Sequence, residues 1–532
     1  MEDTRKLEKN LLRDTPKINK YKEKKMVLFN EHKKKEVGQM SKRLIVLLAV
    51  LLAVSFSVPA FAAVQNVKVS GDLLTRGISR TRFTLSDSYS AVDITTPGGE
   101  KGVQNNVDAI ARLRVDADLT DGVAVTFGTI TERLWGQEDN VSGDSDLDLD
   151  LAYVTLNDVL NFVTQTNIPL SLTLGRQPLR YGNALVIGDP DANLGFRSDS
   201  SNVLSTNYDL SLRKSFDAIK GVLDYDPLVI DLVLAKIDEN GSSRFISDND
   251  DITLYGVNAN YTGFDNMVLD GYWWLRNRGK GNFAAAAATE TEEDEATHVV
   301  GLLAQYNGVN INDSPLMMSL EGAYQFGNIV SDLAYYPDIQ ADMGFEADKS
   351  YKRKAFAVQG SLAYTLQEVK YTPTVVAGYT YLSGQQGDSS TGTHQANSPY
   401  KGWDPMFEDQ GVGTIANALF AASNCHVIKL GATIKPTMDT SLTLDYINAR
   451  LAKSYLNDAT IHVLGLASDL EYTMTDNKNF YQEIDAKFVY DYTEDVQLGL
   501  DAGILIPGDA FSDAAYKLQP ASQVIGSMKV SF

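Results

Sequence analysis

The chain has 532 residues and a formal net charge of −22 at pH 7. This acidic balance argues against a nucleic-acid partner, which would require a basic surface. The single cysteine, Cys425, rules out a disulfide framework and leaves no partner for a cysteine-based metal cluster, and no CxxCH haem motif occurs, so we expect no cofactor.

A secretory signal is predicted at residues 40–62, in the stretch "MSKRLIVLLAVLLAVSFSVPAFA". Lys42 and Arg43 precede an apolar run that ends on Ala-Phe-Ala, which is the order of parts in such a signal. The run is shorter than the roughly 18 residues of a membrane-spanning helix. We interpret residues 1–39 as a non-native extension or a misplaced translation start, and residues 63–532 as an exported domain. Of the 47 basic and 69 acidic residues, 14 and 7 lie in residues 1–62, so the exported part has a net charge of −29.

Apolar and polar residues alternate in one segment after another of the exported part. In "VDAIARLRVDADL" (residues 107–119) the aliphatic side chains oppose the charged ones, and in "LDLDLAY" Leu147, Leu149 and Leu151 oppose Asp148 and Asp150. A period of two predicts strands. Two architectures fit: a soluble sandwich with its charges in water, or a transmembrane barrel with apolar side chains on lipid and charges in a wet lumen.

The lengths of the connections separate these two architectures. About 18 candidate strands are joined by alternating long and short links; "TDG" near residue 121 and "YTED" at 492–495 are tight, whereas residues 384–423 and 453–478 are long. Bacterial outer-membrane barrels have short periplasmic turns, long extracellular loops and an even strand number. We therefore predict an all-β fold, a transmembrane antiparallel barrel of about 18 strands in the bacterial outer membrane, surrounded by its lipids and expected to be a monomer.

The C-terminal stretch "QVIGSMKVSF" has the pattern of a sealing strand. Phe532, Val530 and Met528 share one face, and Ser531 and Lys529 share the other. A barrel removes both sheet edges only when its last strand pairs with its first. The terminal Phe532 also resembles the signal by which the barrel-assembly machinery recognises its clients, so we expect that machinery as a partner.

Several phrases resemble the alginate export family of outer-membrane barrels, from about residue 105 to the C-terminus. "LTLGRQPLRYGNALVIG" (172–188) and "LEGAYQFGNI" (320–329) are similar to fairly specific family elements. "LRKSFDAIKG", "YLSGQQGDSS" and "WDPMFEDQG" are weaker matches in the expected order. The resemblance implies an 18-stranded channel that exports an acidic saccharide.

Ten residues are candidates for the lining of the pore, because a channel is controlled by polar side chains near its constriction. Rows of arginine opposite rows of aspartate would set up a transverse field that binds carboxylates. Pairing of these charges with one another across neighbouring strands, or an interfacial anchor for an arginine at a strand end, are the alternatives. Residues 384–423 fold into the lumen or form a surface lid. The candidates are Arg112, Arg114, Asp148, Asp150, Arg176, Arg180, Tyr181, Arg276, Glu321 and Gln325.

The predicted function is a porin-like channel for passive passage of small hydrophilic or acidic-saccharide solutes. Nothing in the sequence resembles a nucleotide site. The first alternative is a barrel plugged by its loops that acts as a receptor, an adhesin or a scaffold in an envelope complex. A barrel enzyme would need a histidine and a serine on adjacent strands at the rim. His298 and His426 lie at strand starts, but no histidine falls in a catalytic or metal-binding motif, so we do not expect an enzyme.

Overall fold

The structure is a computed structural model, and it describes most of the chain after residue 65. The predicted secretory signal at 40–62 and the extension at 1–39 lie outside the described residues. In the described part, no helix has both the length and the apolar character to cross a membrane. The described residues are 66–83, 85, 103–136, 147–160, 168–192, 208–238, 251–279, 294–311, 314–330, 350–385, 398–454, 460–462, 471–511 and 518–532.

Eighteen antiparallel strands form one sheet. The first nine are β1 (Asn66–Thr81), β2 (Val103–Thr120), β3 (Val123–Leu134), β4 (Asp148–Leu156), β5 (Leu170–Pro178), β6 (Ser215–Asp224), β7 (Leu228–Asp238), β8 (Ile252–Phe264) and β9 (Met267–Arg278). The other nine are β10 (Glu295–Ile311), β11 (Ser314–Val330), β12 (Ser350–Thr365), β13 (Thr374–Leu382), β14 (Cys425–Thr437), β15 (Thr440–Leu451), β18 (Asn479–Asp491), β19 (Val496–Pro507) and β20 (Ala521–Ser531). A separate hairpin joins β16 (Thr460–His462) to β17 (Glu471–Thr473).

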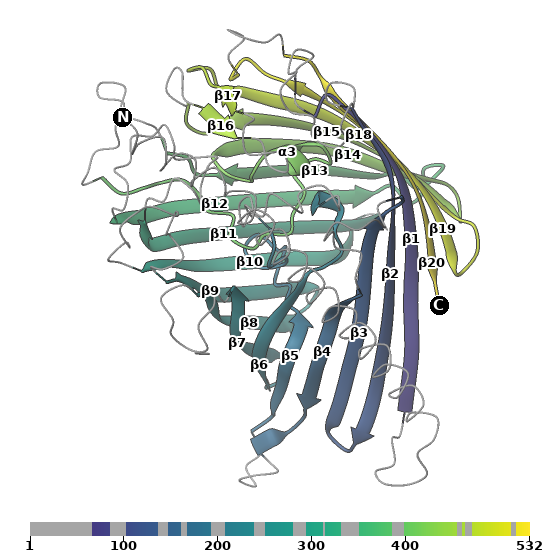
Figure 1. The fold of residues 1–532 in the computed structure, drawn as a ribbon, viewed down its shortest axis with the longest axis vertical. Helices are drawn as coiled ribbons and strands as arrows, with labels where there is room; N and C mark the ends of the chain where they lie inside the picture. The colour runs from purple at the N-terminus through teal and green to yellow at the C-terminus, as the bar shows by residue number, and fades with distance from the viewer. Residues whose placement is uncertain are drawn as a thin grey trace, which may run out of the picture. The chain divides into compact units, whose positions relative to one another are not determined.

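The sheet closes on itself, because β1 pairs with β2 on one side and with β20 on the other (Figure 1). Each intervening strand pairs with the strands next to it in the sheet. At the seam, Leu73 lies opposite Val530, and the backbones of Gly71 and Phe532 exchange hydrogen bonds of 2.9 and 3.0 Å. Closure removes both exposed edges, which confirms the predicted 18-stranded barrel and the sealing role of the last strand.

The two faces of the barrel wall differ in chemistry, as β12 illustrates. Its residues are alternately exposed and buried from Ser350 to Gln359. Phe356 and Val358 are exposed on the outward face, while Arg353 and Gln359 are buried on the inward face. Apolar residues outside and polar residues inside are the arrangement of a membrane barrel, with lipid around it and a polar lumen.

The predicted alternation fails at one place, in β4. The register between β3 and β4 shifts between Gly128 and Thr129, which is a β-bulge. Leu149 is exposed on the outward face, whereas Leu151 is buried. Leu151 lies opposite Gly128 of β3, and Gly128 lies opposite Arg114 of β2, which faces inward. Leu151 therefore faces inward as well. The prediction that Leu147, Leu149 and Leu151 share a face is therefore wrong, because the extra residue of the bulge reverses the facing of the residues beyond it.

Candidate functional site

Three segments between strands pack against the inward face of the wall, and we call them the luminal segments. They are residues 179–192 after β5, residues 208–214 before β6, which include the 3-10 helix η1 (Tyr208–Leu210), and residues 402–424 before β14, which include α3 (Ala416–Leu419). The first and third join through a parallel bridge between Ile187 and Phe407. Residues 402–423 of the loop predicted at 384–423 thus lie in the lumen rather than over it.

Asp404 anchors the third luminal segment to the wall. Its carboxylate accepts from Arg276 at 2.5 Å and lies 3.3 Å from Arg353, while Arg276 also donates to Glu295 at 2.8 Å. Gln325 binds the Asp404 backbone through both ends of its amide, at 2.6 and 2.9 Å. Burial alone would raise the pKa of Asp404, but the two arginines outweigh it and lower that pKa to about 2. Two predicted pore residues, Arg276 and Gln325, therefore hold this segment in place.

Tyr181 and Asn183 anchor the first luminal segment. The Tyr181 hydroxyl donates to Asp231 on β7 at 2.9 Å, and its ring lies 4.8 Å from that of Trp274. Burial raises the pKa of Tyr181, and the negative Asp231 raises it further, so this phenol stays protonated. Asn183 donates to Glu321 at 3.1 Å.

Glu321 is buried in the wall at the centre of a hydrogen-bond network. Besides Asn183, it accepts from Tyr272 and from Gln359, both at 2.8 Å. A Cβ at Gly301 would collide with the Tyr272 ring, so the wall is shaped to admit that side chain. A buried carboxylate with this many partners fixes geometry instead of meeting a passing solute.

A second anchor of the third segment lies elsewhere on the wall, at a residue that was not among the predicted candidates. Glu483 on β18 accepts from the backbone N–H groups of Ile415 at 2.6 Å and Ala416 at 2.9 Å. Thr414 donates its hydroxyl to Asp485 at 2.6 Å and its N–H to the same carboxylate at 3.2 Å. Only the tertiary structure brings the luminal segment to this face of β18.

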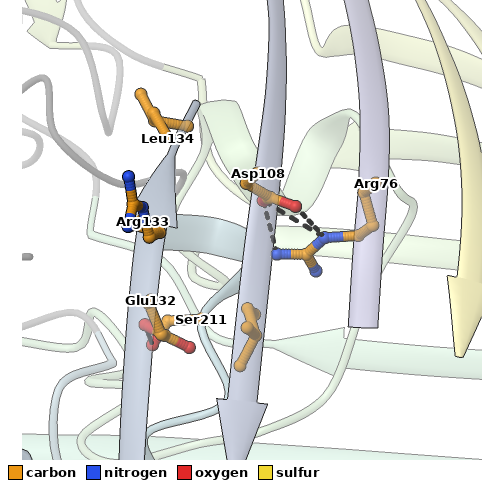
Figure 2. Close-up of a pocket in the computed structure, with 7 residues that line it drawn as sticks. Arg76, Asp108, Glu132, Arg133, Leu134 and Ser211 are labelled. Atoms are coloured by element: carbon orange, nitrogen blue, oxygen red, sulfur yellow. Dashed lines mark hydrogen bonds and ion pairs between the residues drawn. The ribbon is translucent and has the colours of Figure 1, made fainter. Parts of the chain in front are cut away.

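The second luminal segment packs against β1 to β4. Glu132 accepts from the Ser211 hydroxyl at 2.8 Å and the Leu212 N–H at 2.7 Å. Figure 2 shows the small pocket left beside this contact, where Arg76 reaches from β1 to Asp108 on β2 at 2.7 Å.

Two of the predicted acidic residues also hold this part of the chain. Asp148 accepts from Arg213 at 2.8 Å, and Asp150 accepts from Ser215 at 3.2 Å. The predicted opposition of Asp148 and Asp150 to Arg112 and Arg114 is thus replaced by local pairs.

The charges that stay accessible in the lumen are mainly cations. Arg112 pairs with Asp72 on the neighbouring strand, Nε to Oδ1 at 2.8 Å, and Arg114 pairs with Asp116 at 2.8 Å. The Arg112 side chain is 33% exposed and that of Asp72 only 12%. In the luminal segments, Arg180 is 54% exposed and its partner Asp409 25%.

In most luminal ion pairs of the described residues, the cation is likewise more exposed than its carboxylate partner. Lys214 with Asp409, Lys429 with Asp445, and Lys487 with Asp501 each present the cation more openly than the carboxylate. The exceptions are Arg213 with Asp148 and two more deeply buried sites, the pair of Arg80 with Asp209 and the contacts of Asp404 with its arginines. In most of the luminal pairs the carboxylate is less exposed than the cation. Water in the lumen therefore contacts mainly positive groups, although the chain as a whole is acidic.

Arg176 lies on the other face of the wall. It is opposite Ala152 on β4 and Asp217 on β6, with a 3.0 Å bond from its guanidinium to Asp217. Asp217 shares its strand face with the exposed Ile219, whereas the adjacent Phe216 and Ala218 are buried inward. The pore-lining assignment of Arg176 does not fit this register, and its place at the end of β5 matches the alternative of an interfacial anchor.

Asp189 should make the lumen sensitive to pH. Burial, with a smaller contribution from Asp409, raises its pKa to about 6, although the Asp191 N–H and Lys214, whose Nζ lies 3.8 Å away, act to lower it. A raised pKa means that the carboxylate is neutral below it, so between about pH 7 and pH 5 the lumen loses negative charge beside Lys214. We expect the reversal potential in a salt gradient to move toward anions over this range. The Asp189→Asn variant should show the anion-shifted reversal potential at both pH 7 and pH 5. If its reversal potential still changed with pH as in wild type, Asp189 would not be the responsible group.

A closed barrel with an apolar outer face and a charged, water-accessible interior defines an outer-membrane channel protein. The family model described as alginate export matches residues 78–523, and the chain belongs to this family. It is therefore a bacterial outer-membrane transport channel and not an enzyme. The matched range begins earlier than the sequence resemblance at residue 105.

Several solved structures are similar in shape. Pseudomonas aeruginosa OccK11 (OpdR) is 12% identical, with a TM-score of 0.48 over 88% of this chain and 97% of that one. Acinetobacter baumannii OccAB1 is 11% identical, with a TM-score of 0.49 over 89% and 98%. No curated protein matches the chain. At these identities and scores, the solved structures do not bear on what this chain transports.

Proposed function

We propose that this channel passes small anionic solutes passively, with acidic saccharides as the favoured class. The observation that carries the proposal is the exposure of the cation over its carboxylate partner in the luminal ion pairs. Arginine suits such solutes because its planar fork binds a carboxylate through two parallel hydrogen bonds. The remaining predicted pore residues with this property are Arg112, Arg114 and Arg180.

The pairing of these cations also fits passage better than tight binding. Each already has a carboxylate partner, so a solute carboxylate competes for it instead of meeting a bare charge. Conduction requires sites that are favourable enough to enter and weak enough to leave. Half-exposed pairs along the wall from Arg114 to Arg180 would supply such a series.

The test is single-channel current in a planar bilayer, with the protein refolded from detergent and a salt gradient across the membrane. We expect discrete current steps and a reversal potential displaced toward anions, and we expect an acidic oligosaccharide to block these steps more strongly than a neutral one of equal length. A displacement toward cations would contradict the anion path.

The second candidate function is a plugged barrel that acts as a receptor, an adhesin or a scaffold. It is favoured by the number of buried contacts, at Asp404, Glu321 and Glu483, that hold the luminal segments in the lumen. Silence from correctly folded protein in the same bilayer experiment would select this candidate.

Assembly and oligomeric state complete the proposal. The barrel is expected to be a monomer that reaches the membrane through the barrel-assembly machinery, with the β20 strand and Phe532 as the recognition element. Phe532 is 70% exposed, so its ring is accessible to a partner. Deleting Phe532 should lower the amount of assembled barrel in the outer membrane without altering refolding in detergent; equal losses in both would mean that the residue acts only on stability.

A further inference from the structure

Three exposed lysines gather at the extracellular end of the outward face of β12, and we call them the lysine triplet: Lys352, Lys354 and Lys401. The first two are alternate residues of one strand, about 7 Å apart along it. Lys401 joins them because Tyr400 pairs with Arg353 in a parallel bridge. Tyr400 and Arg353 are both buried, so the residues that flank them in sequence face outward.

The triplet lies directly above a belt of aromatic side chains on the same face. Lys354 is opposite Phe326 on β11, and Phe356 is the next outward residue of β12. The belt continues through Tyr381 on β13, 5.1 Å from Phe356 between ring centroids, to His426 on β14 at 4.7 Å from Tyr381. Aromatic girdles mark the level where lipid tails meet head groups. The lysine ammonium groups therefore stand at the head-group level of the outer leaflet.

The charge of this surface is of one sign. None of the three ammonium groups has an ion-pair partner among the described residues, whereas Lys214, Lys429 and Lys487 in the lumen each have one. On the outward face of β11 to β15, the described residues of the extracellular half include Arg450 and no aspartate or glutamate. Elsewhere on the outer wall, charges are mixed, as in the pair of Arg176 and Asp217.

We propose that the lysine triplet binds the phosphate groups of a phosphorylated lipid of the outer leaflet. The surface complements such a molecule in two parts: acyl chains pack on Phe326 and Phe356, and phosphates meet the ammonium groups above them. Lysine binds phosphate as a point charge and can reach the head-group level through its apolar stem. An acidic protein loop would satisfy the charges but would not use the aromatic belt below.

The test measures binding of lipid A to the full-length protein in detergent by native mass spectrometry. The triplet variant is Lys352→Gln, Lys354→Gln, Lys401→Gln. The matched control removes three exposed lysines from the periplasmic end of the barrel, with Lys68→Gln, Lys370→Gln and Lys435→Gln. At about fivefold for each basic residue near a phosphate surface, the triplet variant should bind on the order of a hundredfold more weakly and the control should bind like wild type.

Three results would overturn the proposal. The first is equal affinity of the triplet variant and wild type. The second is equal binding of lipid A from which the phosphates have been removed. The third is inorganic phosphate that displaces the lipid at concentrations near those of the lipid, which would define a free-phosphate site. A variant with arginine at all three positions should retain binding, and heat-modifiable migration in gels confirms that each variant is folded. Because the triplet faces lipid, channel currents should stay unchanged, so this result does not depend on the proposed solute.

Discussion

Replacing Arg112 and Arg114 by glutamine is expected to lower the preference of the channel for anions by about thirtyfold. Both guanidinium groups are accessible in the lumen and stand in front of their carboxylate partners. A unit charge about 4 Å from an ion in water contributes roughly 1 kcal/mol, so two such charges account for roughly this factor. After the substitution, Asp72 and Asp116 no longer have their arginine partners, and the net charge of the wall at this level becomes negative.

The measurement is the reversal potential of single channels in a salt gradient, for wild type and the double variant. The matched control is Arg176→Gln with Arg450→Gln, which removes two arginines from the outward face and should leave selectivity unchanged. If the luminal variant behaved like this control, the ion pairs at Arg112 and Arg114 would serve only to keep the wall wet.

Asp404→Asn should release the third luminal segment from the wall. Asp404 is buried between Arg276 and Arg353, and its removal leaves both guanidinium groups without that countercharge. Breaking a buried ion pair from one side typically costs about 3–5 kcal/mol. We expect larger and noisier single-channel currents, because the segment that narrows the lumen loses its anchor, while the barrel itself stays closed by its strand pairing.

The control and the pH response make this prediction specific. Asp409→Asn in the same segment removes a carboxylate whose side chain is 25% exposed, and it should leave the noise of the current near the wild-type level. The pKa of Asp404 is about 2, below its ordinary value of 3.8, so its stabilising contribution is present above about pH 4 and is lost as the pH falls toward 2. Wild-type channels should become noisy over that range, and Asp404→Asn channels should already be so at neutral pH. Quiet currents from Asp404→Asn would show that Glu483 alone holds the segment.

The luminal segments have two independent sets of anchors, and this affects how the channel opens. Asp404 and Tyr181 tie them to β7 through β12, and Glu483 ties them to β18. A lid would be expected to have few buried contacts. The arrangement instead describes a fixed constriction, in which selectivity depends on the charges that remain accessible.

The barrel could be predicted from the amino-acid sequence without any coordinates. Alternation in segments such as residues 107–119 marked the strands, and the long and short links marked the two ends, because strand period and turn length are local properties of the chain. The same alternation placed Arg112 and Arg114 on the polar face.

The sequence pattern could not separate two kinds of polar residue. Some face the water of the lumen, and others hold the luminal segments in place. Arg276, Gln325 and Glu321 have the sequence pattern of pore residues, yet each is buried by a segment that lies far away in the chain. Arg176 changed faces through the register of β4 to β6, and a single bulge moved Leu151. Lys214 and Glu483 gain their places only from loop contacts. Such contacts depend on where the loops return to the wall in three dimensions, and no local periodicity encodes that.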